Sequence, residues 1–404
     1  MSATSNSSAG RASAVIISVG CLILFISFGV RSTFGVLMEP MSRSLAWPQE
    51  TMSLVLAVQN IVWGIGQPVF GLIADRIGYR KALFVGSALY AIGMLLAAWS
   101  MTPMTQNLTT GVLVGAGISG TSFGMILAVL GRSVAPERRS FVLGLGTAIG
   151  SAGQVFFPIL TQQVLVWFEW DGAMVMLGLS AIVMLPLIAF GIPAMKPAPG
   201  TTIVIANNRH LLKALRDPDF SLIVLGFFSC GYQLAFISAH FPGFVTDLCG
   251  SPTLGATAIA LIGLINILGS LLAGHLGARY PKKNLLAIIY LARTIICAAF
   301  VLIPASPATV VVFSLVMGAI WLSTVPLTSG LVSELFGTQH IATLFGIVFL
   351  GHQIGSALGV WVGGYIYDSY QTYLPAWWFG VAVSGLSILV HIPIREVKRP
   401  WAVA

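Results

Sequence analysis

The chain has 404 residues, of which 57% are hydrophobic and 8% charged, and its mean hydropathy is +0.93. A soluble domain carries about a quarter charged residues, so this composition excludes an ordinary water-soluble fold. The formal charge of +8 does not indicate nucleic-acid binding, because the basic residues stand in small clusters between apolar runs instead of along one stripe.

The polar start of the chain and its cysteines add little chemistry. Residues 1–12 are polar and serine-rich, and the apolar run after them lacks a convincing cleavage site, so we expect it to remain as the first span. The cysteines lack metal-like spacing, and we interpret them as free thiols: Cys21, Cys230, Cys249 and Cys297. We therefore expect neither a metal nor a cofactor.

Apolar runs of about 20 residues, the length that crosses a bilayer, predict an all-α membrane protein with twelve transmembrane helices. Six form a first bundle over 13–192, a cytoplasmic central loop covers 193–218, and six more form a second bundle over 219–394. Cytoplasmic tails are expected at 1–12 and 395–404. In chain order the helices are expected at 13–38, 51–74, 80–101, 107–131, 140–165, 170–192, 219–246, 254–277, 283–304, 307–332, 341–367 and 375–394.

Lysine and arginine indicate how these helices cross the membrane. Of the 20 basic residues, 17 fall on one side if the N-terminus is cytoplasmic, one (Arg43) falls in a connection on the other side, and two (Arg31 and Arg293) lie inside apolar runs. Cytoplasmic loops carry such an excess of positive charge. We expect a monomeric, multi-pass protein of the cell (inner) membrane with both termini in the cytoplasm.

The two halves of the sequence repeat each other. The segment 27–34 aligns with 229–236 at an offset of 202, which pairs Arg31 with Gln233. The same offset relates Gly144 and Gly153 to Gly346 and Gly355, and an offset of 203 relates Gly66, Gly71 and Arg76 to Gly269, Gly274 and Arg279. Parallel repeats of this kind indicate two bundles with a binding site at their interface.

A glycine- and charge-rich motif follows the second helix: Gly71-Leu72-Ile73-Ala74-Asp75-Arg76-Ile77-Gly78-Tyr79-Arg80-Lys81. It resembles the signature of the major facilitator superfamily between helices two and three, and this resemblance implies a latch on the cytoplasmic side. We expect Asp75, next to Arg76, to pair with Arg132. The alternative interpretation is a capped helix end followed by a solvated basic loop.

The second copy of this motif departs from the pattern. Ala278 replaces the aspartate, and Glu334 stands where Arg132 stands in the first half. We hypothesise that Arg279 pairs with Glu334 and restores a latch with reversed polarity.

Four further segments, 28–36, 136–140, 324–330 and 363–368, carry a finer resemblance. Through them the chain resembles bacterial monocarboxylate-porter type carriers and oxalate/formate antiporters within the superfamily. The resemblance implies a small organic anion as substrate. Helix eight departs from it, because Asn266 stands there without the substrate-binding arginine that those carriers often have. Helix five, with Gly150-Ser151-Ala152-Gly153, lacks the Gly-Pro pair of drug/proton antiporters.

Arg31 is the principal candidate for substrate binding. An arginine inside a membrane without a nearby carboxylate indicates an anionic ligand as its counter-charge, and we expect Arg31 to face Gln233 and grip a carboxylate with two hydrogen bonds. Alternatively, Arg31 reaches outward to the membrane surface or pairs with Glu39. For Arg293 we favour a structural role, bonding helix-end carbonyls or Glu334, over ligand contact.

Polar residues on other helices could complete the site. His352 could supply a second, switchable positive charge and is the candidate for proton coupling, or it serves as an interhelical hydrogen-bonding group. The further candidates for the substrate site are Asn60, Trp63, Gln154, Tyr232, Asn266 and Gln353.

These features predict a secondary active transporter that works by alternating access. No carboxylate stands in mid-span, so the transport is either proton-coupled symport through His352 or anion exchange. The alternative is an efflux carrier for drugs or other amphipathic metabolites, although that would favour an acidic residue in the cavity. A membrane enzyme would need a nucleophile–base or metal constellation, and a non-transporting sensor would need an added soluble domain; we find neither.

Overall fold

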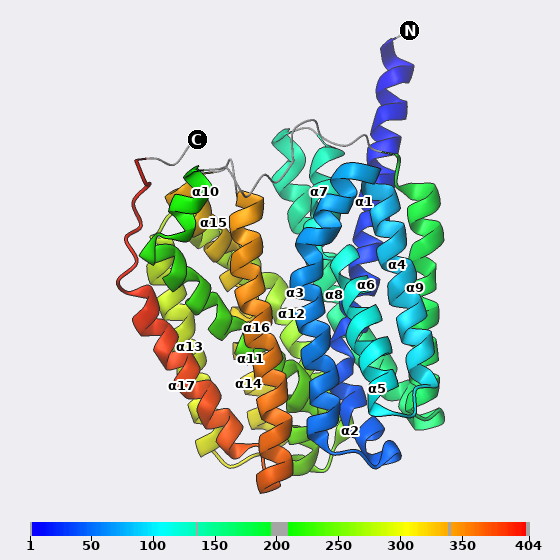
Figure 1. The fold of residues 1–404 in the computed structure, drawn as a ribbon, viewed down its shortest axis with the longest axis vertical. Helices are drawn as coiled ribbons and strands as arrows, with labels where there is room; N and C mark the ends of the chain where they lie inside the picture. The colour runs from blue at the N-terminus through cyan, green and yellow to red at the C-terminus, as the bar shows by residue number, and fades with distance from the viewer. Residues whose placement is uncertain (1, 135, 195–208, 338–340, 401–404) are drawn as a thin grey trace.

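The computed structural model describes residues 2–134, 136–194, 209–337 and 341–400 (Figure 1). In these ranges every regular element is a helix. The elements are α1 (Ser2–Ser32), α2 (Phe34–Leu45), α3 (Gln49–Ile77), α4 (Tyr79–Ala98), α5 (Pro103–Gln106), the π-helix η1 (Asn107–Leu113), α6 (Val114–Gly120), α7 (Phe123–Arg132), α8 (Pro136–Trp167), α9 (Trp170–Gly191), α10 (Arg209–Leu215), α11 (Pro218–Cys249), α12 (Pro252–Gly277), α13 (Lys282–Leu302), α14 (Pro307–Ile320), α15 (Thr324–Phe336), α16 (Ile341–Tyr370) and α17 (Leu374–His391).

Twelve helical segments of the described chain are long and apolar enough to cross a membrane, which confirms the predicted fold class. The first span continues through α2, so Arg43 lies in the last turn of that helix and not in a connection. At the other end of this span, α1 begins at Ser2 and includes most of the expected tail. The central loop expected at 193–218 falls mainly on 195–208, outside the described residues.

The fourth and tenth spans are interrupted near their middles. The break in the fourth lies between α6 and α7, and that in the tenth lies between α14 and α15. Hydroxyl groups at both breaks bond backwards to helix carbonyls, Thr121 to Gly117 at 3.0 Å and Ser323 to Ala319 at 2.9 Å. Such side-chain bonds compete with the helical ladder.

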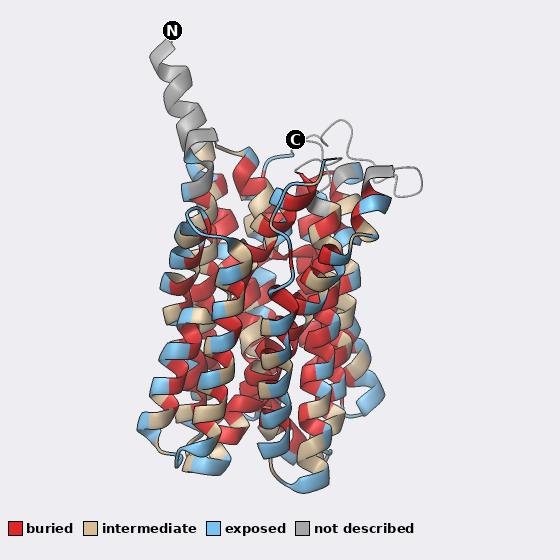
Figure 2. Ribbon diagram, turned by 90° about the vertical axis from the view of Figure 1, so that its left-hand side faces the viewer, coloured by how far each residue is buried: buried red, intermediate tan, exposed pale blue. Residues whose placement is uncertain are grey.

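The two halves pack by the same plan. In the first half α1 packs on α8 and α4 on α9, and in the second half α11 packs on α16 and α13 on α17. Each half surrounds its own apolar core, one built chiefly from residues 16–192 and the other from 211–394. Buried residues occupy the interior of the helical bundle from one end to the other (Figure 2). Between the halves, α3 packs on α16, α8 on α12, and α2 on α11.

The packing fixes the alignment of the first and seventh spans. Gly29 of α1 contacts α8, and Tyr232 of α11 makes the corresponding contact with α16. These two residues are 203 positions apart. Gly35 lies directly against the backbone of Ser238, its own equivalent at the same offset, and this close approach leaves no room for a β-carbon. The equivalent of Arg31 is therefore Leu234. The expected offset of 202 is wrong by one residue here, which on a helix is a rotation of about 100°.

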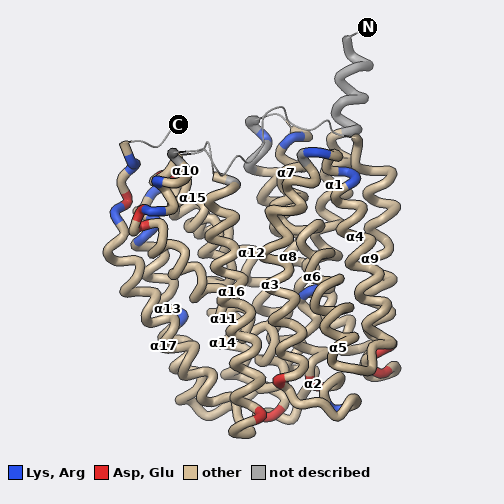
Figure 3. The backbone as a smooth tube through the Cα atoms, viewed as in Figure 1, with Lys and Arg blue, Asp and Glu red and all other residues tan. Residues whose placement is uncertain are grey.

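Charge divides the two ends of the bundle. Most lysine and arginine residues lie at the end that carries both termini, which we name the terminal side (Figure 3). The opposite side carries acidic residues and few basic ones.

The halves approach closely on the opposite side and diverge on the terminal side. In the middle of the bundle, Gly64 of α3 packs against Gln353 of α16, and Gly263 of α12 packs against Gln154 of α8. Two or three turns nearer the terminal side, a β-carbon added to a glycine would meet no described atom within 4 Å apart from the neighbouring backbone of its own helix. These open positions are Gly71, Gly144, Gly274 and Gly346. The space between the halves therefore opens toward the terminal side.

Candidate substrate site

Arg31 lies at the interface of the two halves and is held by α3. Its Nη2 donates to Asn60 Oδ1 at 3.3 Å, and its guanidinium lies 4.6 Å from the centre of the Trp63 ring. A cation over an aromatic face is attracted by the ring quadrupole. The expected alternative partner, Glu39, is bonded instead to Arg43 at 2.6 Å. Arg31 thus keeps its place through an amide and a ring, neither of which neutralises its charge.

The second half completes this group from α16. The Phe349 ring meets Trp63 edge-on with the centroids 5.3 Å apart, and His352 stacks on Phe349 with an interplanar angle of 5°. Gln353 follows, fully buried, against Gly64. Of the predicted site residues, the structure therefore brings together Arg31, Asn60, Trp63, His352 and Gln353.

Three buried hydrogen-bond donors of this group are unused. Arg31 Nε, Trp63 Nε1 and Gln353 Nε2 are buried and have no partner in the structure. Buried polar atoms are almost always bonded, so each exception calls for an explanation. All three atoms are N–H donors, and a ligand that satisfied them would have to be rich in acceptors.

His352 is a hydrogen-bonding group of α16 as well as a neighbour of the interface. Its Nδ1 lies 3.1 Å from Gln353 Oε1 and 3.4 Å from Ser356 Oγ. The ring also packs on Phe227 of α11, with the centroids 4.7 Å apart. His352 therefore links the Arg31 group to the interior of the second half.

Gln233 and Tyr232 do not lie with Arg31. Gln233 Nε2 donates to the Gly380 carbonyl of α17 at 3.1 Å, and Tyr232 packs on Phe236 and on Phe379 of α17. Both side chains face their own half, as the one-residue shift of the repeat requires. The prediction that Gln233 faces Arg31 across the interface is wrong.

Asn266 joins the halves by a different contact. Its Nδ2 donates to Ser151 of α8 at 3.2 Å, and its Oδ1 accepts from Ser270 and from the backbone N–H of Leu322. These bonds use both ends of the Asn266 amide, and they connect α12 to α8 and to the break before α15. Gln154, on the neighbouring turn of α8, is partly exposed against Gly263.

Arg293 is enclosed in the second half with no exposed surface. Its Nη2 donates to the carbonyls of Ile320 and Trp321, at 2.8 and 2.5 Å, and its Nη1 donates to Cys230 Sγ at 3.3 Å. The two carbonyls belong to the C-terminal end of α14, where helix carbonyls lack partners. The guanidinium thus bonds helix-end carbonyls, which was one of its expected partners.

The expected latch on the terminal side is described only in part. The Asp75 side chain lies outside the described residues, so its pairing with Arg132 stays a prediction; Arg132 itself lies 4.6 Å from the centre of the Tyr79 ring. Glu334 pairs with Lys282 at 2.6 Å instead of with Arg279, which corrects the expected partner. Lys282 begins α13 and reaches Glu334 in the last turns of α15. Arg76 and Arg279 are exposed.

A cross-half contact on the opposite side had not been predicted. The Asp368 carboxylate, near the end of α16, accepts from the backbone N–H groups of Gln49 and Glu50 at 3.0 and 2.6 Å. These groups begin α3 of the first half, where a carboxylate is favoured by the helix dipole. Glu50 in turn accepts from Trp361 Nε1 at 3.1 Å. The start of a helix after Pro48 can be recognised in the sequence. The residue that caps it cannot, because Asp368 lies 319 positions away from Gln49.

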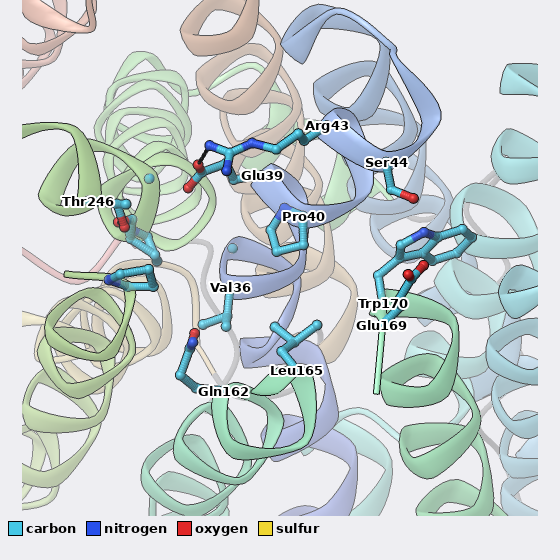
Figure 4. Close-up of a pocket in the computed structure, with 14 residues that line it drawn as sticks. Val36, Glu39, Pro40, Arg43, Ser44, Gln162, Leu165, Glu169, Trp170 and Thr246 are labelled. Atoms are coloured by element: carbon cyan, nitrogen blue, oxygen red, sulfur yellow. Dashed lines mark hydrogen bonds and ion pairs between the residues drawn. The ribbon is translucent and has the colours of Figure 1, made fainter. Parts of the chain in front are cut away.

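A pocket of about 530 Å³ lies between α2, α8 and α9 of the first half and α11 and α12 of the second (Figure 4). Glu39, Arg43 and Glu169 line it, with Gln162 and Thr246 on facing walls. Two carboxylates and one guanidinium make this pocket a poor match for an anion. Because both halves supply its walls, its shape depends on their relative position.

Comparison with known proteins agrees with this architecture. A model of the Major Facilitator Superfamily matches residues 20–359. The chain belongs to this superfamily. Its fold resembles that of the nucleoside transporter NupG (TM-score 0.75, 14% identity, covering 94% of this chain and 99% of that one). It also resembles that of a D-xylose-proton symporter (TM-score 0.74, 15% identity, covering 96% and 99%).

Two curated relatives cover most of the chain. An uncharacterised MFS-type transporter, YcxA of Bacillus subtilis (strain 168), is 25% identical over 378 residues, which are 91% of this chain and 92% of that protein. Monocarboxylate transporter 13 of Bos taurus is 26% identical over 374 residues, covering 91% and 86%. The family and fold of this superfamily member are thus those of transporters in a membrane.

Proposed function

We propose that this transporter moves a small organic anion, a monocarboxylate or a chemically similar acid, across the membrane by alternating access between its two bundles, 13–192 and 219–394. The unsatisfied donors of Arg31, Trp63 and Gln353 carry the proposal. A carboxylate would accept from them and neutralise the guanidinium, and charge-assisted bonds of this kind are the strong ones.

The surroundings of Arg31 support an anion over a cation. Among the described residues, no carboxylate lies within ion-pair distance of its guanidinium. Leaving a charge unpaired inside a membrane is costly, and the cost favours an arriving counter-ion. Similarity to a monocarboxylate transporter agrees with this chemistry.

The proposed orientation places the terminal side in the cytoplasm. Basic residues gather at that end (Figure 3), and cytoplasmic loops carry such an excess. In this orientation the space between the halves opens inward, and the Asp368 contact closes the outer side. Transport would require that contact to break and the cytoplasmic latch, with Asp75, Arg76, Arg132 and Arg279, to form. His352 remains our proposed proton-coupling residue in a symport cycle.

Uptake into proteoliposomes tests the proposal. Labelled mono- and dicarboxylates would be offered with and without a pH gradient to the wild type, Arg31→Gln and Arg43→Gln. We expect Arg31→Gln to lower uptake about 10- to 100-fold, because a hydrogen bond to a charged group contributes roughly 1.5–3 kcal/mol. Arg43→Gln, the matched control at an exposed ion pair, should transport as the wild type does.

Each result separates two interpretations. Unchanged carboxylate uptake in Arg31→Gln would remove Arg31 from the site. If the wild type moved amphipathic compounds but none of the acids, the substrate class would be wrong and an efflux carrier would replace it.

A further inference from the structure

The two halves differ at one set of equivalent positions. In the first half Ser27 Oγ lies 2.8 Å from Thr121 Oγ1 at the break of the fourth span, and Tyr90 donates to the Ser27 carbonyl at 3.0 Å. The residues 203 positions later are Cys230, Thr324 and Arg293. Their contacts are equivalent too, since Cys230 Sγ lies 3.1 Å from Thr324 Oγ1 and accepts from Arg293. A neutral hydroxyl cluster in one half is therefore a thiol–guanidinium cluster in the other.

Arg293 needs a negative partner. It has no exposed surface, guanidinium stays protonated in proteins, and among the described residues no carboxylate lies within ion-pair distance of it. The carbonyls of Ile320 and Trp321 supply only the partial charge of a helix C-terminus. The remaining atom that Nη1 contacts is the Cys230 sulphur, and a thiol beside arginine ionises readily.

We propose that Cys230 and Arg293 form a thiolate–guanidinium pair that takes up and releases the proton of the transport cycle. This proposal rests on the proposed function. Proton uptake converts the thiolate to a thiol and leaves Arg293 without its counter-charge. The proton taken up comes from a ring nitrogen of His352, which returns to neutral imidazole and regains a proton from water on the interface side. On release, His352 has first lost its proton to water, and its neutral ring takes the proton from the thiol, which restores the pair.

The surroundings of Cys230 offer one route for that proton. Tyr290 and Arg293 face the sulphur from α13, Thr324 from α15 and His352 from α16. Tyr290 is engaged, because its hydroxyl donates to the Gly226 carbonyl at 2.7 Å. His352 interacts with the sulphur and also stacks on Phe349, which contacts Trp63 beneath Arg31. The thiol is thus connected to the substrate site through a single titratable ring.

The pair also spans the break in the tenth span. Arg293 bonds the end of α14, and Cys230 contacts Thr324 at the start of α15. Protonation of the thiolate weakens the contacts of the sulphur with Arg293 and Thr324, while Arg293 keeps its bonds to the end of α14. Protonation therefore alters the link between the two parts of that span, which is a change that alternating access can use.

The first experiment detects the thiolate in purified full-length protein. Cys21, Cys249 and Cys297 are replaced by alanine, and thiolate ultraviolet absorption is titrated with and without Cys230→Ser. An ordinary cysteine is only a few per cent ionised at pH 7, so we expect roughly tenfold or more thiolate from Cys230. Ionisation no greater than that of an ordinary thiol would overturn the proposal. Cys230→Ser copies the pair present in the first half, which favours its folding.

The second experiment measures transport of the identified acid by Cys230→Ser in proteoliposomes. We expect the pH gradient to lose its stimulation of uptake, while exchange of the substrate without a gradient continues. Stimulation equal to that of the wild type would overturn the role in proton transfer. If the wild type carried no organic acid at all, the proposed function would fail, whereas the thiolate titration would still decide the ion pair.

Discussion

Arg31 and Arg293 look alike in the sequence, since each is an arginine inside an apolar helix. Their surroundings differ in kind. Arg293 has no exposed surface and bonds two carbonyls and a sulphur of its own half. Arg31 is partly exposed at the interface, rests on Trp63, and has one hydrogen bond to a side chain.

This contrast indicates two different roles for a charge inside a membrane. Both guanidinium groups keep a buried Nε–H without a partner, but both terminal nitrogens of Arg293 are bonded inside one bundle. A guanidinium held in this way fixes that bundle, and its loss is a loss of stability. A guanidinium left with unused donors between two bundles is prepared for a partner that comes and goes. Burial and the hydrogen-bond partners together separate the two roles.

Arg293→Gln should give the largest effect on stability. It removes the donors of the Ile320 and Trp321 carbonyls, and each buried group left unbonded costs about 1–3 kcal/mol. We expect a loss of about 3 kcal/mol or more, seen as a lower thermal midpoint in detergent or as failure to fold. Arg31→Gln, the matched change at the interface, should unfold close to the wild type. A reversed order of the two midpoints would contradict the comparison.

Gln353 and Gln233 test the same contrast between an interface residue and a residue enclosed in one half, with a smaller expected effect. Gln353→Met removes a donor from the Arg31 group at nearly constant volume, and we expect substrate affinity to fall about tenfold. Gln233→Met removes the bond to Gly380 and should leave affinity unchanged. Substrate-induced thermal stabilisation of the purified protein measures both. A tenfold loss in Gln233→Met would return that residue to the site.

The sequence was sufficient to predict the helices but not the hydrogen-bond partners of their side chains. Hydrophobic length and basic clusters depend on the bilayer and can be recognised locally, so all twelve spans were predictable. The partner of Arg31 depended on a register between repeats, where an error of one residue turned Gln233 away from the interface. The partner of Asp368 is a helix start in the other half, which only tertiary packing brings close.

A third arginine gives the ordinary case against which the first two can be judged. Arg399 lies outside the spans and bonds Asp217 at 2.8 Å and also Asp219. Burial acts to raise the pKa of Asp217, but the hydrogen bonds from Arg399 and from the Asp219 backbone outweigh it and hold that pKa below its ordinary value. A lowered carboxyl pKa stabilises the fold above the unfolded value, near 3.9, and this stability is lost as the pH falls through the lowered value.

Arg399→Gln should therefore cost about 1 kcal/mol at neutral pH, the smallest of these effects. The gap between the thermal midpoints of wild type and variant should narrow below about pH 4, as Asp217 becomes protonated in both. The corresponding gap for Arg293→Gln should persist there, since carbonyls do not titrate and most of its bonds go to them. If the Arg293→Gln gap closed completely in acid along with that of Arg399→Gln, the stability contributed by Arg293 would come from a titrating partner and not from the two carbonyls. Its contrast with Arg31 would then need a different physical basis.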